Sequence, residues 1–388
     1  MALINKLSAI GDAIREKTGK ENLLTLDQMP EEIKGISGGG EEIEPIVLSG
    51  NCDYACAGPL SGEFIKLYGN KISTKNITSS RYMFYYNTKI EEIPFEINLS
   101  TASSLTNMFF DCRNLKTINS INSNGTTKVS GSNVFKNCYQ LNSVVFNNFN
   151  ITGLGYAFEN CYNLNQIKLN NTTLSNLTTG DMNYSFSHCY SLKELPENLF
   201  DGLNPAWTNY RYSIYYGGFY YCCVLNSITD IPVGGTFTSN SFNEFVLRCY
   251  RLKDLTFTNR VSTANWKNQT IDLSGYVGYA PFPEEILNYN SGITADKEVK
   301  DDATYQALKN DPDWYSCKSA YSRYNHDSAV ATINSLPDTS AYLATAGGTN
   351  TIKFKGNAGS LTDGGAINTL TEEEITVATN KGWTITFV

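Results

Sequence analysis

The sequence is poor in histidine, in clustered positive charge and in long apolar runs, and each shortage excludes a class of function. Only His188 and His326 among the 388 residues are histidines, which leaves few catalytic bases near neutral pH. The 30 Lys and Arg are scattered and are outnumbered by 38 Asp and Glu, for a net charge of −8. Nucleic-acid binding is therefore not expected. Because no run of about 18 apolar residues occurs, membrane insertion is not predicted either.

Residues 1–17 also lack the apolar centre and the cleavage site of a secretory signal. The segment is amphipathic and carries charges throughout its length. We therefore expect the chain to be made and assembled in a cytoplasm, where thiols stay reduced.

A recurring phrase of the form aromatic-x-x-Cys-x-x-Leu-x-x-(Leu/Ile/Val) is the main positive signal. Full copies begin at Phe109, Phe135, Phe158, Phe186 and Phe219, and weaker copies at Phe84 and Val246. The repeat cysteines lie 23 to 33 residues apart and are Cys112, Cys138, Cys161, Cys189, Cys222 and Cys249. Repeats of this length predict a solenoid whose coils bury their apolar faces against one another. The spacing of three favours a short helical or 3₁₀ turn leading into a strand.

The phrase resembles the BspA-type leucine-rich repeat, whose signature is similar to MFxxCxxLxxL followed by a second short strand. The stretch Tyr82–Asn87 resembles an opening version in which Asn87 stands in place of Cys. The resemblance implies an α/β repeat fold, a BspA-type leucine-rich-repeat solenoid, which we assign to residues 45–290. Within residues 45–80, the apolar segments Ile46–Leu48 and Phe64–Tyr68 are candidate strands.

The ten cysteines allow two interpretations. A disulfide scaffold is one, but six of the cysteines share one repeat position, where a small buried thiol fits the core. We favour buried free thiols. A zinc site is not expected, because neither histidine lies near a cysteine pair of suitable spacing. Between the apolar positions, the many asparagines predict side-chain hydrogen-bond ladders.

Residues 1–36 are predicted to form two short helices, followed by a Gly-rich linker at 37–44. A helix seam of the a/d type is formed by Leu3, Leu7, Ile10 and Ile14. The matching residues 4–7, 10–19 and 24–36 resemble the leader of bacteriophage tail and baseplate-associated structural proteins. The resemblance implies an attachment and oligomerisation unit, for which we expect a homotrimer. An ordinary capping helix pair is the alternative.

Residues 291–388 are predicted to hold the last repeats and a strand-helix-strand C-terminal cap. The expected strands are Ile352–Phe354 and Trp383–Phe387. Between them, a capping box of Thr371 and Glu374 starts a helix that Gly382 closes. A further helix is expected from an N-cap at Ser328 to Leu336, before Pro337.

No catalytic constellation is evident, so we predict a protein without enzymatic activity, metal or cofactor. His188 beside Cys189 would form a nucleophilic pair only if the cysteine left the core. Carboxylate pairs of the glycosidase kind are Glu194 with Glu197 and Glu284 with Glu285, but sequence proximity does not set their separation across a sugar. Solvated surface carboxylates are the simpler interpretation. Phosphate-binding and calcium-binding loop motifs are missing.

An aromatic insertion before Phe219 provides the candidate contact surface. It contains Trp207, Tyr210, Tyr212, Tyr215 and Tyr216, and Tyr220 and Tyr221 follow. Aromatic rings with polar tips suit sugars or partner proteins, although some of them are expected to pack in the core.

Together these patterns favour a structural component of a phage tail or a phage-tail-like particle. Its N-terminal helices would bind tail or baseplate proteins, and its solenoid would bind a host-cell surface receptor, either a glycan or a surface-layer protein. The chain would then belong to a virion tail assembled in the bacterial cytoplasm. The alternatives are a BspA-like bacterial surface adhesin and a tailspike-type glycan hydrolase.

Overall fold

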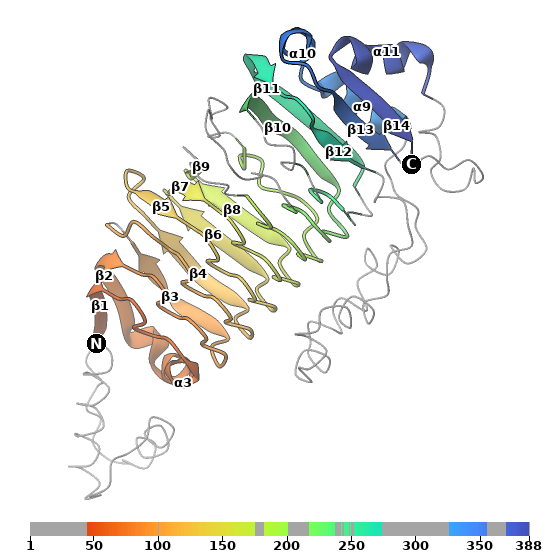
Figure 1. Ribbon diagram of the computed structural model, residues 1–388. Coiled ribbons are helices and arrows are strands. Elements are labelled where there is room, and N and C mark those ends of the chain that lie inside the picture. Colours follow the sequence, from red (N-terminus) through yellow and green to blue (C-terminus); the bar gives the residue numbers. More distant parts are fainter. Residues whose placement is uncertain are drawn as a thin grey trace, which may run out of the picture.

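The computed structural model shows a parallel β-solenoid of about seven coils (Figure 1). It describes residues 45–99, 101–174, 182–200, 217–236, 242, 244–247, 249, 252–273, 326–354 and 370–387. Successive strands lie side by side from the N-terminal end of the body to the C-terminal end. The predicted helical leader and the linker lie outside the described residues, and the domain boundaries 36, 44 and 290 stay predictions.

The central coils contribute parallel strands to two sheets. One sheet has the order β3-β4-β6-β8, with bounds Glu92–Asn98, Thr117–Asn122, Ser143–Asn147 and Gln166–Asn170. The other has the order β5-β7-β9, with bounds Lys128–Ser130, Asn150–Gly153 and Thr173–Leu174. Strand order follows the chain, as a stack of coils requires, and side chains alternate inward and outward with period two.

Three further parallel groups complete the described strands. Strand β1 (Ile46–Asn51) pairs with β2 (Ile72–Ser79), and β10 (Ser227–Thr236) pairs with β11 (Asp254–Asn265). A last sheet has the order β12-β13-β14, with bounds Thr270–Asp272, Asn350–Phe354 and Trp383–Phe387. Helices α9 (His326–Ser335) and α10 (Ser340–Ala346) pack on β11, and α11 (Glu372–Asn380) packs on β14 and α9.

The strand expected at Phe64–Tyr68 is wrong, because these residues form the end of helix α3 (Pro59–Tyr68). Proline stands at the start of the helix, where its missing N–H is not needed. Phe64 contacts Tyr68 four residues later, with ring centroids 5.0 Å apart. A 3₁₀ turn, η1 (Gly69–Lys71), then leads into β2. Apolar residues at helical and strand spacing are hard to distinguish over five positions.

The turn between the two sheets is also not the helical or 3₁₀ turn that the spacing of three favours. Two positions in each phrase, two residues before and two after the repeat phenylalanine, adopt positive φ. In the coil of Phe109 these are Asn107 at 56° and Asp111 at 62°. Each lies inside a β-turn, closed by Met108 N donating to Leu105 O and by Cys112 N donating to Phe109 O. Consecutive β-turns of this kind repeat every three to four residues, so they mimic helical spacing.

The turn amides form a ladder along the solenoid. Phe109 N donates to Val134 O of the next coil at 2.8 Å, and Asp111 N donates to Lys136 O at 2.9 Å. Equivalent bonds join successive coils from Cys56 to Phe245, for example Phe84 N to Met108 O at 2.8 Å. The turns are therefore held as firmly as strands, because their backbone groups are paired.

Two buried columns fill the core. The repeat phenylalanines stack with centroids 4.8 to 5.5 Å apart, from Phe84 to Phe219. The six repeat cysteines are buried, which confirms their predicted place in the core. Each thiol donates to the carbonyl of the phenylalanine in the preceding coil, at 2.9 to 3.2 Å. Asn87, which replaces cysteine in the opening phrase, keeps this contact: its Nδ2 donates to Cys56 O at 3.0 Å.

The predicted asparagine ladders are confirmed. In one ladder, Asn122, Asn147 and Asn170 each donate to the asparagine of the preceding coil, at 2.9, 2.7 and 2.9 Å, beginning from Asn98. A second runs from Asn160 to Asn137 and on to Asp111. A side-chain amide has both a donor and an acceptor, so each asparagine can bond to the asparagine of the coil before it and of the coil after it.

At the C-terminal end, the strands and the capping box of the sequence prediction are confirmed. Glu374 N donates to Thr371 Oγ1, Thr371 N donates to the Glu374 carboxylate, and Gly382 follows α11 with a φ of 81°. Ser328 is not an N-cap, because it lies buried inside α9. The role of the strand-helix-strand segment as a cap stays a prediction.

Candidate functional site

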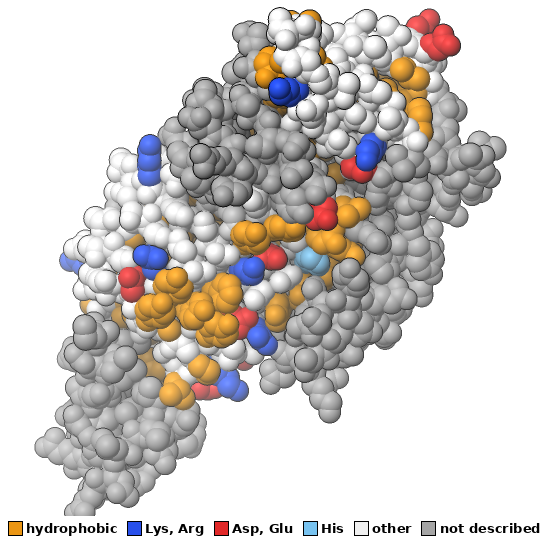
Figure 2. Space-filling view, viewed as in Figure 1, with side chains coloured by type: hydrophobic (Ala, Val, Ile, Leu, Met, Phe, Trp, Pro, Cys, Tyr) orange, Lys and Arg blue, Asp and Glu red, His pale blue; other side chains and the backbone are white. Residues whose placement is uncertain are grey.

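Aromatic side chains gather where the turns of the first coils meet, and we call this set the tyrosine face. Its members are Tyr54, Tyr82, Tyr85, Tyr86 and Phe110. They come from three consecutive coils: the turn after β1, the turn after β2 and the turn before β4. Tyr54 is 54% exposed and Tyr86 is 44% exposed, whereas the other three are half-buried. Figure 2 shows hydrophobic side chains gathered over these N-terminal coils.

The rings of the tyrosine face pack against one another in fixed geometry. Tyr54 stacks on Tyr82 with centroids 4.8 Å apart and planes 2° apart. Tyr85 meets Tyr82 edge-on at 5.3 Å and Tyr86 edge-on at 4.5 Å. Phe110 contacts both Tyr85, at 5.3 Å, and Tyr86, at 5.7 Å. Such contacts fix ring orientation before any ligand arrives.

The backbone beneath these rings is both paired and strained. Tyr54, Tyr82 and Tyr86 have φ of 57°, 58° and 54°, a left-handed conformation that bulky residues adopt rarely. In other coils the same positions carry asparagine, such as Asn107 and Asn137, which tolerates this conformation better, or again tyrosine, as at Tyr156. Tyrosine therefore stands there at a conformational cost.

The phenol groups of the tyrosine face lie close to one another. Burial first, and then the neighbouring phenols of Tyr86, Tyr54 and Tyr82, raise the pKa of Tyr85, whose hydroxyl is hydrogen-bonded with Tyr86. The Arg81 guanidinium lies 5.8 Å from the centroid of the Tyr82 ring. Asp53 accepts hydrogen bonds from Ser79 Oγ and Arg81 N, at 2.5 and 2.9 Å. The face thus offers hydroxyls and ring surface with the Arg81 guanidinium beside them, and its carboxylate is already bonded.

In the following coils, the same outward positions carry paired charges. Arg113 Nε donates to both carboxylate oxygens of Asp111, each at 3.2 Å. Next to it along the solenoid, Lys136 pairs with Glu159 and lies over the Tyr156 ring at 4.7 Å. These ion pairs lie next to the tyrosine face along the solenoid.

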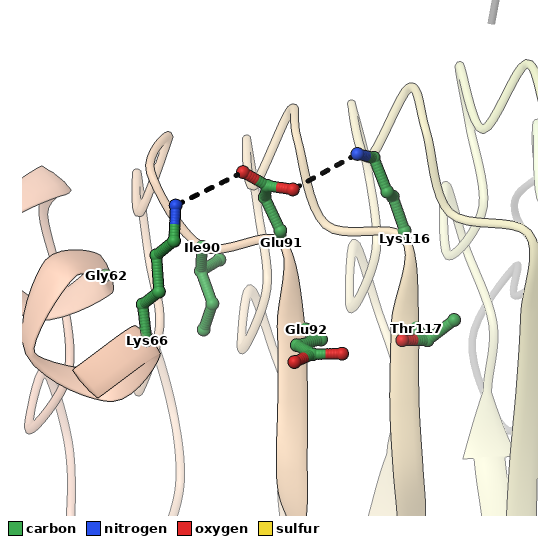
Figure 3. Close-up of a pocket in the computed structure, with 7 residues that line it drawn as sticks. All are labelled: Gly62, Lys66, Ile90, Glu91, Glu92, Lys116 and Thr117. Atoms are coloured by element: carbon green, nitrogen blue, oxygen red, sulfur yellow. Dashed lines mark hydrogen bonds and ion pairs between the residues drawn. The ribbon is translucent and has the colours of Figure 1, made fainter. Parts of the chain in front are cut away.

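A pocket of about 400 Å³ lies beside α3, at the start of strands β3 and β4 (Figure 3). Figure 3 shows the Glu91 carboxylate between Lys66 of α3, at 3.9 Å, and Lys116, at 3.1 Å. The hydrogen bond from Lys116 is the main cause of the lowered pKa of Glu91. Since all three side chains are roughly half-exposed, the bridge contributes little to stability. Gly62 fits here because a Cβ would lie 2.7 Å from Ile90 N.

The carboxylate pair Glu194 and Glu197 lines a second pocket of about 300 Å³ together with Asp230. Both glutamates are exposed at the surface. Glu284 and Glu285 lie outside the described residues.

The histidine and cysteine of the nucleophilic alternative are not arranged for catalysis. Cys189 is buried, its thiol donates to Phe158 O at 3.2 Å, and desolvation raises the pKa of that thiol. His188 stacks on the buried Tyr221 at 4.9 Å, and desolvation lowers the pKa of His188 to about 4. Within the described ranges, no three His, Cys, Asp or Glu side chains are grouped to hold a metal ion.

Several predicted site residues lie outside the described residues: Trp207, Tyr210, Tyr212, Tyr215, Tyr216, Leu3, Leu7, Ile10 and Ile14. The tyrosine face was not among the predicted sites. One signal for it was available, since Tyr82, Tyr85 and Tyr86 occupy outward positions of a phrase whose inward positions are Met83 and Phe84. None of the helices in the described part of the chain is long and apolar enough to cross a membrane.

Comparison with known proteins agrees with the coil geometry. Residues 108–201 match the family model for the BspA type leucine rich repeat region, in six copies. No curated protein and no solved structure matches the chain. The repeat phenylalanines, the thiol column and this match together identify the repeats of residues 108–201 as BspA-type leucine-rich repeats.

Proposed function

We propose that this protein is a non-catalytic recognition module, in which the solenoid presents a rigid surface for adhesion to a bacterial cell. BspA-type repeats support a surface-adhesion or binding role. The observation that carries the proposal is the tyrosine face, where exposed rings are held on a fully hydrogen-bonded backbone at strained φ. Rigid aromatic side chains bind with little loss of conformational entropy.

In its finer form, the proposal assigns the chain to a phage tail or a phage-tail-like particle. Residues 1–36 would bind tail or baseplate proteins as a homotrimer, and the solenoid would bind the host receptor. This form rests on the likeness of the leader to those of tail-associated proteins. Trp207, Tyr210, Tyr212, Tyr215 and Tyr216 are proposed as further receptor contacts.

Immunogold electron microscopy of producing cells and of particles released from them tests the finer form. Label at tail tips or fibres would support it. Label on the outer surface of the producing cell, with none on particles, would instead support a BspA-like adhesin. Light scattering of the full chain and of a chain lacking residues 1–36 tests the trimer.

The recognition role itself is tested by binding of fluorescently labelled full chain to bacterial cells. We expect saturable binding that an excess of unlabelled chain displaces. Incubation with purified surface polysaccharide should leave its chain length unchanged, because the proposal includes no hydrolysis. Shortened polysaccharide would point to the tailspike-type hydrolase.

A further inference from the structure

The size of the tyrosine face bears on what it binds. It comprises five aromatic side chains from three coils, with Arg81 beside them. A stable protein–protein interface uses about 20–30 residues on each side. A surface of five rings is far smaller than that, and it matches a ligand of a few sugar rings better than a protein.

The electrostatics bear on the charge of the ligand. The carboxylates around the face are bonded within the chain: Asp53 accepts from Ser79 and Arg81 N, and Asp111 accepts from Arg113. The Arg81 guanidinium lies 5.8 Å from the centroid of the Tyr82 ring. Burial and the neighbouring phenols raise the pKa of Tyr85. A cationic ligand would find these carboxylates already bonded, whereas a hydroxyl-rich neutral ligand would find several donors and acceptors.

The arrangement of exposure bears on how such a ligand would lie. The two most exposed rings, Tyr54 and Tyr86, flank the half-buried Tyr82 and Tyr85. Tyr54 stacks face to face on Tyr82 and meets Tyr85 edge-on at 6.3 Å. Apolar ring surface at both margins with hydroxyls between them suits the alternating apolar and hydroxyl-bearing surfaces of a sugar chain.

We propose that the tyrosine face binds a neutral oligosaccharide, with sugar rings against Tyr54 and Tyr86 and sugar hydroxyls bonded to the phenols of Tyr82 and Tyr85. This inference deepens the recognition role proposed above and rests on it. It assigns that role to residues 54–110.

The residues at equivalent positions of other coils suggest suitable variants for a test. Asparagine occupies the position of Tyr54 in other coils, as Asn107 and Asn133, and the position of Tyr86, as Asn137. Tyr54→Asn and Tyr86→Asn therefore delete a ring while keeping a residue that tolerates positive φ. Tyr156→Asn is the control, because Tyr156 shares the position and the conformation of Tyr54, at φ 57°, but stacks on Tyr184 away from the face.

The experiment is isothermal titration of the full chain with neutral hexose and N-acetylhexosamine oligomers and with a uronic-acid oligomer. We expect binding of at least one neutral oligomer, weakened about tenfold by Tyr54→Asn or Tyr86→Asn and by less than about twofold by Tyr156→Asn. Tyr85→Phe, which keeps the ring and removes the hydroxyl, should also weaken binding. Circular dichroism melting checks that each variant is folded.

The outcomes separate the inference from the recognition role. If wild-type chain binds cells but Tyr54→Asn and Tyr86→Asn bind them equally well, the inference fails and the recognition role stands. Tighter binding of the uronic-acid oligomer would overturn the proposal that the ligand is neutral. Loss of cell binding after protease treatment of the cells, with no response to any oligomer, would show a protein partner instead. If wild-type chain binds no cell, the proposed function itself fails.

Discussion

The first coils and the central coils share one backbone and one core but differ in their outward positions. Phe84 and Phe109 stack as Phe135 and Phe158 do, and the turn amides pair in the same way. Outside this common frame, the first coils carry a cluster of contacting tyrosines, whereas the central coils carry amides and ion pairs beside the stacked Tyr156 and Tyr184. The inward columns therefore maintain the coil, and the outward columns are left available for chemistry.

The largest expected effect tests the inward side of this comparison. Phe135→Ala removes a fully buried ring between two stacked neighbours, and should lower the free energy of unfolding by about 3–5 kcal/mol. Urea denaturation followed by circular dichroism measures it. Lys116→Ala, which removes the half-exposed ion pair with Glu91, should cost less than about 1 kcal/mol. Equal losses for both would contradict the division into inward and outward columns.

His188 offers a pH-dependent test at an outward position of the coil. Its folded pKa of about 4 lies below the ordinary 6.5, because burial disfavours the charged ring. Between these values the unfolded chain takes up a proton that the folded chain does not. Stability should therefore fall as pH drops from 6.5 towards 4, by about 1.4 kcal/mol per pH unit.

Urea denaturation at several pH values, compared with His188→Asn, isolates this effect, because the carboxylates are common to both proteins. Asparagine stands at the same position as Asn137 and Asn160. His326 should behave in the opposite way, since hydrogen bonds with Asp327 and Glu374 raise its pKa. Its contribution is present at acid pH and lost as pH rises through the folded pKa. Identical pH slopes for wild type and His188→Asn would rule out the assignment to His188.

The asparagine ladder predicts a smaller, graded effect. Asn147 donates to Asn122 and accepts from Asn170, whereas Asn170 makes one bond within the ladder. Asn147→Ala should cost about 1–2 kcal/mol and Asn170→Ala about half as much, because each net hydrogen bond contributes roughly 0.5–1.5 kcal/mol. Thermal or urea unfolding measures both. A greater loss at Asn170 would show that the ladder is not the source of stability.

The smallest effect is expected at the tyrosine face. Tyr54→Asn removes one stacked pair but relieves a strained φ, so the two terms oppose each other and stability should change by less than about 1 kcal/mol. The same unfolding measurement applies. A much larger loss would indicate that the face is a structural element and would weaken its proposed role in binding.

The inward half of the structure could be predicted from sequence because it is periodic. Phe109, Cys112 and Leu115 recur with their spacing, and burial of all three follows from stacking. The capping box at Thr371 was equally predictable, because its two bonds are local. What these signals share is that each depends on residues close in sequence or on exact repetition.

The turn type, helix α3 and the tyrosine face could not be predicted, because the spacing of residues in the sequence does not determine them. A spacing of three fits both a 3₁₀ turn and consecutive β-turns, and only the φ of residues such as Asn107 separates them. The segment Phe64–Tyr68 is short enough to fit a helix or a strand. The tyrosine face arises because Tyr54 and Tyr82, 28 positions apart, become neighbours through coil stacking. The coil of Tyr54 lacks the phrase, so its register was not visible.

The direction of the turn ladder has a mechanical consequence. Its hydrogen bonds, such as Phe109 N to Val134 O, run along the long axis of the solenoid. Tension between the ends of the repeat array would load these bonds coil by coil, so that coils detach one after another. With 23 to 33 residues between repeat cysteines, each event releases about 80–110 Å of chain. A tether of this kind lengthens in steps under load and absorbs work before any surface contact has to break.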